Sequence, residues 1–270
     1  MPSRTQALVF SLVRRFGQRL RGGVLGVQEY ALLSARALAA VFTQPRYPRE
    51  WLAQADVLGV QSLSIVVLTG TFTGMVLALQ SAASLDAFGA RPYVGRLVCV
   101  SMVRELGPVL TALMVTGRVA SGMAAELGSM VVTQQIDALR VLGTDPVRKL
   151  VAPRILAGMV MVPILTVVSD TVGIFGGGII SVFSLAQSWV FYWRMVAQSL
   201  VVNDLVMGLS KPLFFGFILS SVGCYMGLRT TGGTQGVGVS TTRSVVVASV
   251  LILASDLFIT KLLLVLFPVV

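Results

Sequence analysis

The sequence has no histidine, and Cys99 and Cys224 are its only cysteines among 270 residues. A metal site built from His or Cys ligands and a His-dependent catalytic triad are therefore not expected, and no cofactor is predicted. Charged residues are also scarce, at 12% of the chain, whereas soluble domains carry about 25%. Hydrophobic residues make up 55% of the chain, and the mean hydropathy is +0.86. This composition indicates a polytopic membrane protein.

Long apolar segments predict five transmembrane helices, since a helix needs about 20 residues to cross the hydrocarbon core. The first segment lies between Asp56 and Asp86 and carries no charge. The predicted spans are about 57–85, 97–117, 155–183, 205–228 and 244–267. The expected fold class is therefore all-α, with residues 56–270 forming a transmembrane domain.

Residues 1–55 are predicted to form an N-terminal amphipathic region that lies on the cytoplasmic membrane surface. The early arginines follow the short apolar stretch 7–13 instead of preceding a longer one, so a cleaved signal peptide is not expected. Residues 1–28 contain no acidic residue, which leaves an organelle transit peptide as an alternative.

The distribution of positive charge predicts the orientation. Regions 1–56, 118–154 and 229–243 hold 15 Lys and Arg residues, whereas the loops near 86–96 and 184–204 hold three. The positive-inside rule therefore places the N-terminus in the cytoplasm and the C-terminus outside. The net charge of +10 does not favour nucleic-acid binding, because the basic residues lie between apolar runs and lack interleaved aromatic residues.

Five charged residues fall inside the predicted spans: Arg104, Glu105, Asp170, Lys211 and Asp256. Each would cost about 2.5–3.5 kcal/mol if it faced lipid, so we expect them to face inward and to pair. Arg104 and Glu105 are adjacent and point in different directions on a helix, so they cannot simply neutralise each other. By depth, Lys211 can pair with Glu105 or Asp256. A purely structural role in holding helices together is the alternative to a functional one.

The connection 118–154 is predicted to contain a cytoplasmic amphipathic helix within 124–146. Its apolar residues recur at i, i+4 and i+7: Val132, Ile136 and Leu139. Its polar face carries Thr133, Asp137 and Arg140. Gly143 and Pro146 predict the end of this helix. The helix either lies on the membrane surface or docks on a cytoplasmic partner.

Small residues indicate how the spans pack. Gly70 and Gly74 form a G-x-x-x-G step, which allows two helix backbones to approach closely. Five spans with few polar groups make a small bundle, and a wide translocation path would need a second copy. A homodimer is therefore expected.

The segment RELGPVLTALMVTGRVASGMAAELGSMVVTQQIDALRVLGTDPVRKLVAPR, residues 104–154, resembles the MlaE (YrbE) family of ABC-transporter permeases. GTFTGMVLALQ at 70–80 and STTRSVV at 241–247 also resemble family segments. The resemblance implies a homodimer of five-span subunits with an N-terminal interfacial helix. It also implies two copies of a cytoplasmic ATPase and an MCE-domain protein on the outer side. Such a complex moves phospholipids, or related lipids, between the bacterial inner membrane and the outer envelope.

The resemblance also implies roles for particular residues. The family's coupling helix, which contacts the ATPase, matches Thr133, Gln134, Ile136, Asp137, Leu139 and Arg140. Gln134 replaces a glutamate that is common in the family. The family's lipid pocket matches Leu77, Leu85 and Phe88, with Arg104 and Glu105 as its intramembrane charged pair. Ser84 stands where an apolar wall residue is expected.

Two other function classes compete with this reading. An ion-coupled secondary transporter could use the carboxylates of Glu105, Asp170 and Asp256, but the odd span number and the lack of a visible inverted repeat count against it. An intramembrane enzyme has little support, because no nucleophile–base pair stands out. The sequence has no G-x-x-x-x-G-K-[ST] loop, so ATP would be hydrolysed by a partner.

Overall fold

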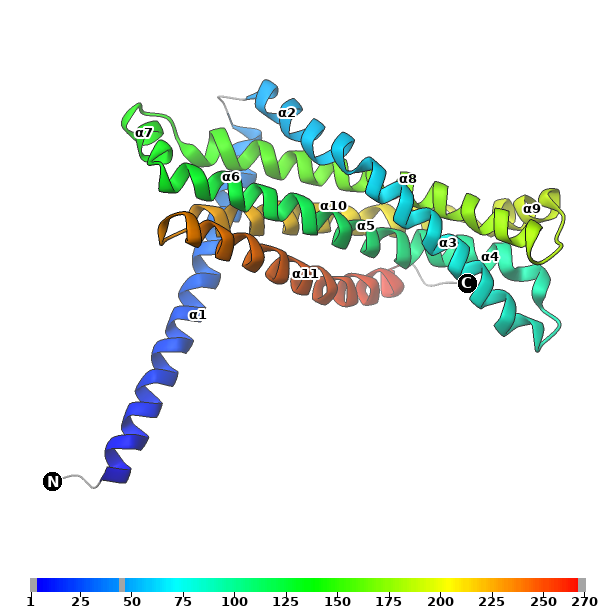
Figure 1. Cartoon of the computed structure of the whole chain (residues 1–270), viewed down its shortest axis with the longest axis horizontal. Coiled ribbons are helices and arrows are strands. Elements are labelled where there is room, and N and C mark those ends of the chain that lie inside the picture. Colours follow the sequence, from blue (N-terminus) through cyan, green and yellow to red (C-terminus); the bar gives the residue numbers. More distant parts are fainter. Residues whose placement is uncertain (1–3, 44–46, 267–270) are drawn as a thin grey trace.

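The computed structural model describes residues 4–43 and 47–266, which form helices and no strand. The α-helices are α1 (Arg4–Phe42), α2 (Pro48–Gly59), α3 (Leu63–Asp86), α4 (Val94–Ser101), α5 (Gly107–Val115), α6 (Ser121–Val132), α7 (Gln135–Val141), α8 (Ala152–Phe183), α9 (Trp189–Ser199), α10 (Val202–Leu228) and α11 (Gly233–Leu266). The predicted all-α class is confirmed. Most of the long helices run side by side in one elongated bundle (Figure 1).

Short 3₁₀ and π turns join several helices into longer ones. The 3₁₀ turns are Val60–Ser62 and Arg91–Tyr93, and the π turns are Met102–Leu106, Thr116–Ala120 and Val147–Val151. Among the described residues, six helical stretches are long and apolar enough to cross a membrane: Gly23–Val41, Pro48–Asp86, Arg91–Val132, Val147–Phe183, Val202–Leu228 and Gly233–Leu266. Five of them contain the five predicted spans, apart from residue 267, which lies outside the described residues.

The sixth stretch, Gly23–Val41, lies in α1, within the region predicted to be interfacial. Figure 1 shows α1 crossing the bundle and leaving it steeply, whereas the other long helices follow the long axis. A helix that lies crosswise to the spans runs closer to the membrane plane, which agrees with an interfacial position. The interfacial assignment and the division at residue 55 stay predictions.

The second span is longer than the sequence indicates. The predicted helix ended near Gly117, whereas the helical stretch runs on to Val132. The prediction was wrong because the residues after Arg118 were read as a loop. They keep a buried face against α10 and α11, formed by Met123, Ala124, Leu127 and Gly128. The connection between the second and third spans therefore shrinks to residues 133–146.

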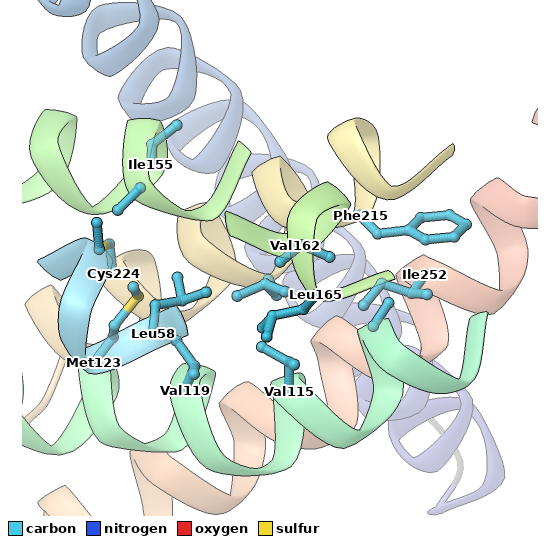
Figure 2. Close-up of a cluster of buried hydrophobic side chains, with 14 of the residues drawn as sticks. Leu58, Val115, Val119, Met123, Ile155, Val162, Leu165, Phe215, Cys224 and Ile252 are labelled. Atoms are coloured by element: carbon cyan, nitrogen blue, oxygen red, sulfur yellow. The ribbon is translucent and has the colours of Figure 1, made fainter. Parts of the chain in front are cut away.

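One hydrophobic cluster holds the α7 half of the bundle together (Figure 2). Its side chains come from α1, α2, α3, α5, the second and third π turns, α6, α8, α10 and α11. They include Leu58, Val115, Val119, Met123, Ile155, Val162, Leu165, Phe215, Cys224 and Ile252. Cys224 lies inside this cluster as a buried free thiol. A second cluster, around Val98 and Tyr192, lies toward the other end.

Glycines let the central helices approach closely. A Cβ atom at Gly74 would collide with the carbonyl of Gly173, and one at Gly158 would collide with Ser220. The G-x-x-x-G step of α3 therefore lies against α8, the pair of helices in most extensive contact. A G-x-x-x-G step alone is weak evidence of helix packing, and the structure shows that here it packs α3 against α8.

The two ends of the bundle differ. α7 lies at one end, and α9 with the connection between α3 and α4 lies at the other (Figure 1). An aromatic cluster such as that of α9 is typical of an interfacial belt, but Tyr192 is buried and donates a hydrogen bond to the carbonyl of Ile174 at 2.8 Å. Trp189 remains partly exposed, as a belt residue would be.

Candidate functional site

A network of charged side chains lies inside the bundle, centred on the first π turn. The turn Met102–Leu106 interrupts the helix at Arg104 and Glu105. A π turn adds a residue to the helical turn and is frequent at functional sites. The guanidinium of Arg104 contacts Oδ1 of Asp204 through Nη2 at 2.6 Å and Nε at 2.7 Å. The adjacent Glu105 turns to a different partner.

That partner is Lys211, of which 1% of the surface is exposed. Its Nζ lies 2.7 Å from Oε2 of Glu105 and 3.3 Å from Oδ1 of Asp256. It also donates a hydrogen bond to the carbonyl of Arg104 at 3.0 Å. Thr260 donates to Oε1 of Glu105 at 3.1 Å. Both carboxylates that were compatible with Lys211 by depth therefore pair with it.

The network joins three long helices through charge. It combines the cations Arg104 and Lys211 with the carboxylates of Glu105, Asp204 and Asp256. Removing one partner of a buried pair typically costs about 3–5 kcal/mol, because the other charge is left uncompensated. Glu105 keeps 41% of its side chain exposed, so the network opens to the surroundings at this carboxylate.

The sequence analysis missed Asp204. It was placed just outside the fourth span, which was predicted to begin at Leu205, whereas α10 begins at Val202 and buries Asp204. One signal could have found it. Asp204 precedes Lys211 by seven residues, so both lie on the same face of one helix.

Asp170 does not join the network. It is buried on α8, and its Oδ1 has no hydrogen-bond partner within the residues that the structure describes. The carboxylate lies against Gly107, where a Cβ atom would collide with Oδ1. The structure therefore brings together four of the five predicted intramembrane charges and separates the fifth.

An open groove of about 330 Å³ runs beside the network. Its lining comes from α3 and from the residue after Glu105: Phe72, Thr73, Val76, Leu77, Gln80 and Leu106. Of the three predicted pocket residues, only Leu77 lines it. Leu85 packs against the second hydrophobic cluster, and Phe88 is 84% exposed in the connection after α3. Ser84 is exposed as well. Lipid contact by these residues stays a prediction.

The predicted coupling helix is a separate short helix, α7. Gln134, with φ of 60°, precedes it in the left-handed conformation and breaks it from α6. Left-handed backbone is unusual for a residue other than glycine. At the other end, Gly143 has φ of 73° and the N–H groups of Gly143 and Thr144 donate to the carbonyls of Arg140 and Leu139. This arrangement is a Schellman motif, which ends the helix at the predicted glycine.

The predicted amphipathic pattern holds within α7 but not before it, because Val132 lies on α6 and is exposed. Ile136 is buried, whereas Asp137 and Arg140 are exposed and pair with each other at 2.9 Å. Val141 and Leu142 at the end of α7 are 87% and 77% exposed. Sequence analysis missed these two, because an apolar pair beside a turn gives no signal that separates a buried position from an exposed one.

The charge network can form ion pairs, and the groove beside it can form apolar contacts. Across residues 4–43 and 47–266, no three side chains of His, Cys, Asp or Glu gather as a metal site. Taken with the fold, the geometry defines a class: a polytopic helical membrane protein with charges paired in its interior and an exposed short helix at one end.

The comparisons with known proteins make the assignment specific. A family model described as Permease MlaE matches residues 51–262. The chain therefore belongs to the MlaE permease family, as its sequence resemblance predicts, and is a permease subunit of the ABC-transporter type.

Relatives support the same assignment. A probable ABC transporter permease protein of Rickettsia conorii is 38% identical over 255 residues, which cover 94% of this chain and 98% of that protein. The intermembrane phospholipid transport system permease protein MlaE of Haemophilus influenzae is 37% identical over 77% of this chain and 80% of that protein. TRIGALACTOSYLDIACYLGLYCEROL 1, chloroplastic, of Arabidopsis thaliana is 38% identical over 77% of this chain and 59% of that protein.

Proposed function

We propose that this permease moves phospholipids, or related lipids, between the bacterial inner membrane and the outer envelope as a homodimer. A separate cytoplasmic ATPase docks on α7 and supplies the energy, and an MCE-domain protein binds at the opposite end. The N-terminus is cytoplasmic and the C-terminus lies outside. The name of the Haemophilus influenzae relative supports the substrate class.

The observation that carries the proposal is the exposed end of α7. Val141 and Leu142 project from a helix whose two ends are held by a left-handed residue and a Schellman motif. A rigid short helix with an apolar tip and a paired polar face presents a defined surface to a partner. Val132, just before α7, ends the helical stretch that began at Arg91.

Movement of α7 would reach the charge network through that stretch. Arg104 and Val132 belong to one helical stretch, and 28 residues of helix span about 42 Å. A shift of α7 would therefore displace the π turn that carries Arg104 and Glu105. Because Leu106 lines the groove beside Glu105, the same displacement would reshape the apolar surface offered to an acyl chain.

A homodimer agrees with the distribution of exposed apolar residues. α11 is largely exposed along its length, with large side chains such as Leu257 and Phe258 on the surface. α3 likewise exposes Leu68, Phe72 and Val76 on one face. These faces offer apolar area to membrane lipid and to a second copy.

Replacing Val141 and Leu142 with Asp tests the docking role. We expect the ATPase recovered with the purified permease to fall at least about tenfold, because each buried charge at an apolar contact costs several kcal/mol. The matched control is Phe183→Asp, since Phe183 is 83% exposed at the other end of the bundle. Equal ATPase recovery from the α7 variant and the control would refute docking on α7.

Replacing Leu77 with Glu tests the groove. A carboxylate on the groove wall should lower the amount of phospholipid that co-purifies with the permease. Contact between an acyl chain and an unpaired charge is unfavourable. Leu79→Glu is the control, since Leu79 is exposed on α3 but does not line the groove. Normal lipid content in the Leu77 variant would contradict the groove assignment.

The ion-coupled alternative keeps one observation in its favour: Oδ1 of Asp170 has no hydrogen-bond partner among the described residues. Glu105 and Asp256 are both engaged by Lys211. Transport by the purified complex distinguishes the two mechanisms. Lipid movement that requires ATP supports the ABC permease, whereas movement driven by an ion gradient without ATP supports the alternative.

A further inference from the structure

A second, larger cleft lies at the α7 end of the bundle, away from the groove. It has a volume of about 860 Å³ and is lined by parts of α1, the end of α6, the end of α10 and the start of α11. Val131, at the end of α6, is one of its lining residues and precedes α7 by four positions. None of the residues assigned to the groove, the charge network or the α7 docking surface lines it.

One wall of the cleft is a face of α1 that carries two glycines. Gly23, Gly26, Val27 and Tyr30 recur at i, i+3, i+4 and i+7, so they share one face of the helix. Glycine inside a helix costs about 1 kcal/mol relative to alanine. Two such glycines side by side keep the cleft open, because any larger side chain at Gly23 would project into free space.

The inner wall is an aromatic pair held by hydrogen bonds. The rings of Tyr30 and Tyr225 meet edge to face with centroids 5.6 Å apart. Tyr225 donates from its hydroxyl to the carbonyl of Gly26 at 3.0 Å, and Tyr30 is hydrogen-bonded to Ser221 at 2.8 Å. Tyrosine rings with one apolar side and one polar end are enriched where membrane meets water.

The polar lining is basic and rich in hydroxyl groups: Arg229, Thr230, Thr231, Ser240 and Arg243. No acidic side chain lines the cleft among the described residues. Arg229 is already engaged, by the hydroxyl of Tyr225 at 2.6 Å and by Glu29 at 3.0 Å. Arg243 is exposed and has no ion pair or hydrogen bond within the described part of the chain, so it supplies the uncompensated positive charge.

The rest of the lining is apolar. Val27, Val131, Met226 and Leu228 complete the cleft beside the arginines. Guanidinium groups bind phosphate oxygens through paired N–H donors, and threonine and serine hydroxyls add further donors. A ligand that matches both the basic lining and the apolar lining carries a phosphate and a hydrocarbon chain. Basic pockets between membrane helices bind anionic lipid headgroups on the same principle.

We propose that this cleft binds the headgroup of an anionic phospholipid from the membrane leaflet at the α7 end. Arg243 and the hydroxyl groups hold the phosphate, and the first part of an acyl chain lies along the apolar lining. The bound lipid ties α1 to the ends of α6 and α10, next to α7. The site does not depend on the transport proposal, because it shares no residue with the groove.

The test uses the full-length protein in neutral detergent with phosphatidylglycerol that carries a photoreactive group near the phosphate. After illumination, peptide mapping should find label on 23–30 or 226–243. Arg243→Gln should lower that labelling about tenfold, as expected for loss of a charge-assisted hydrogen bond. Arg36→Gln is the control, since it removes the same charge from α1 at an exposed position outside the cleft.

A second variant removes the space and keeps the charge. Gly23→Leu places a side chain in the cleft without a collision at Cβ, so labelling should fall while the thermal unfolding temperature does not. Unchanged labelling in both cleft variants would overturn the proposal, as would full competition by inorganic phosphate. Labelling of 72–80 reports on the groove separately, so a failure there counts against the transport proposal alone.

Discussion

Ion pairs occur in two very different settings in this protein. In the bundle, Lys211 is fully enclosed and lies within 3.3 Å of two carboxylates. On α7, Asp137 and Arg140 form an equally short pair at 2.9 Å, but both side chains are about two-thirds exposed. The distances between the charged atoms are similar in the two regions, whereas the burial of the side chains differs. Burial therefore decides which pair the fold depends on and which pair is available to a partner.

The largest expected effect follows from removing the central cation. Lys211→Met leaves Glu105 and Asp256 facing each other without compensation, so we expect a loss of about 3–5 kcal/mol in the free energy of unfolding. Unfolding in detergent by a chemical denaturant measures it. Lys261→Met is the control, because Lys261 is exposed. Similar stability of the two variants would remove the distinction between buried and exposed charges.

An intermediate effect is expected at the edge of the network. Asp204→Asn removes the charge opposite Arg104 but keeps an oxygen that can accept its N–H donors. We expect a loss of about 1–3 kcal/mol, smaller than for Lys211→Met, because a charge-assisted hydrogen bond becomes an ordinary one. The same unfolding measurement ranks the two variants. A larger loss for Asp204→Asn would place the centre of the network at Arg104.

The smallest effect on stability is expected on α7. Exchanging the charges, as Asp137→Arg with Arg140→Asp, keeps an i,i+3 pair and should change the free energy of unfolding by less than about 0.5 kcal/mol. Recovery of the ATPase should nevertheless fall, because the charge pattern presented to the partner is reversed. A stability loss comparable to that of Asp204→Asn would show that the exposed pair supports the fold.

Much of the architecture was predictable, because apolar runs and charge asymmetry carry strong signals. The spans, the candidate partners of Lys211 and the helix end at Gly143 all follow from residue type and spacing. The extension of the second span to Val132 did not follow, because small residues and an exposed glutamate, Glu126, make this segment look like a loop. Only the packing against α10 and α11 makes those residues helical core.

The site was predictable only in part, for a different reason. A π turn shifts the helical register by one residue, and no sequence pattern marks where it occurs. Arg104 and Glu105 lie on the turn Met102–Leu106 and face Asp204 and Lys211, whereas Asp170 stays apart against Gly107. Partners that depend on three-dimensional register, such as Asp204, therefore had to come from the structure.

The stretch Arg91–Val132 stays helical through its two π turns, and this has a mechanical consequence. Its 42 residues give a lever of roughly 60 Å. A tilt of about 5° around its middle would swing each tip by roughly 2–3 Å, in opposite directions. A small displacement of this stretch on one side of the bilayer is thereby transmitted to the other side, and the intervening helices need not unfold or repack.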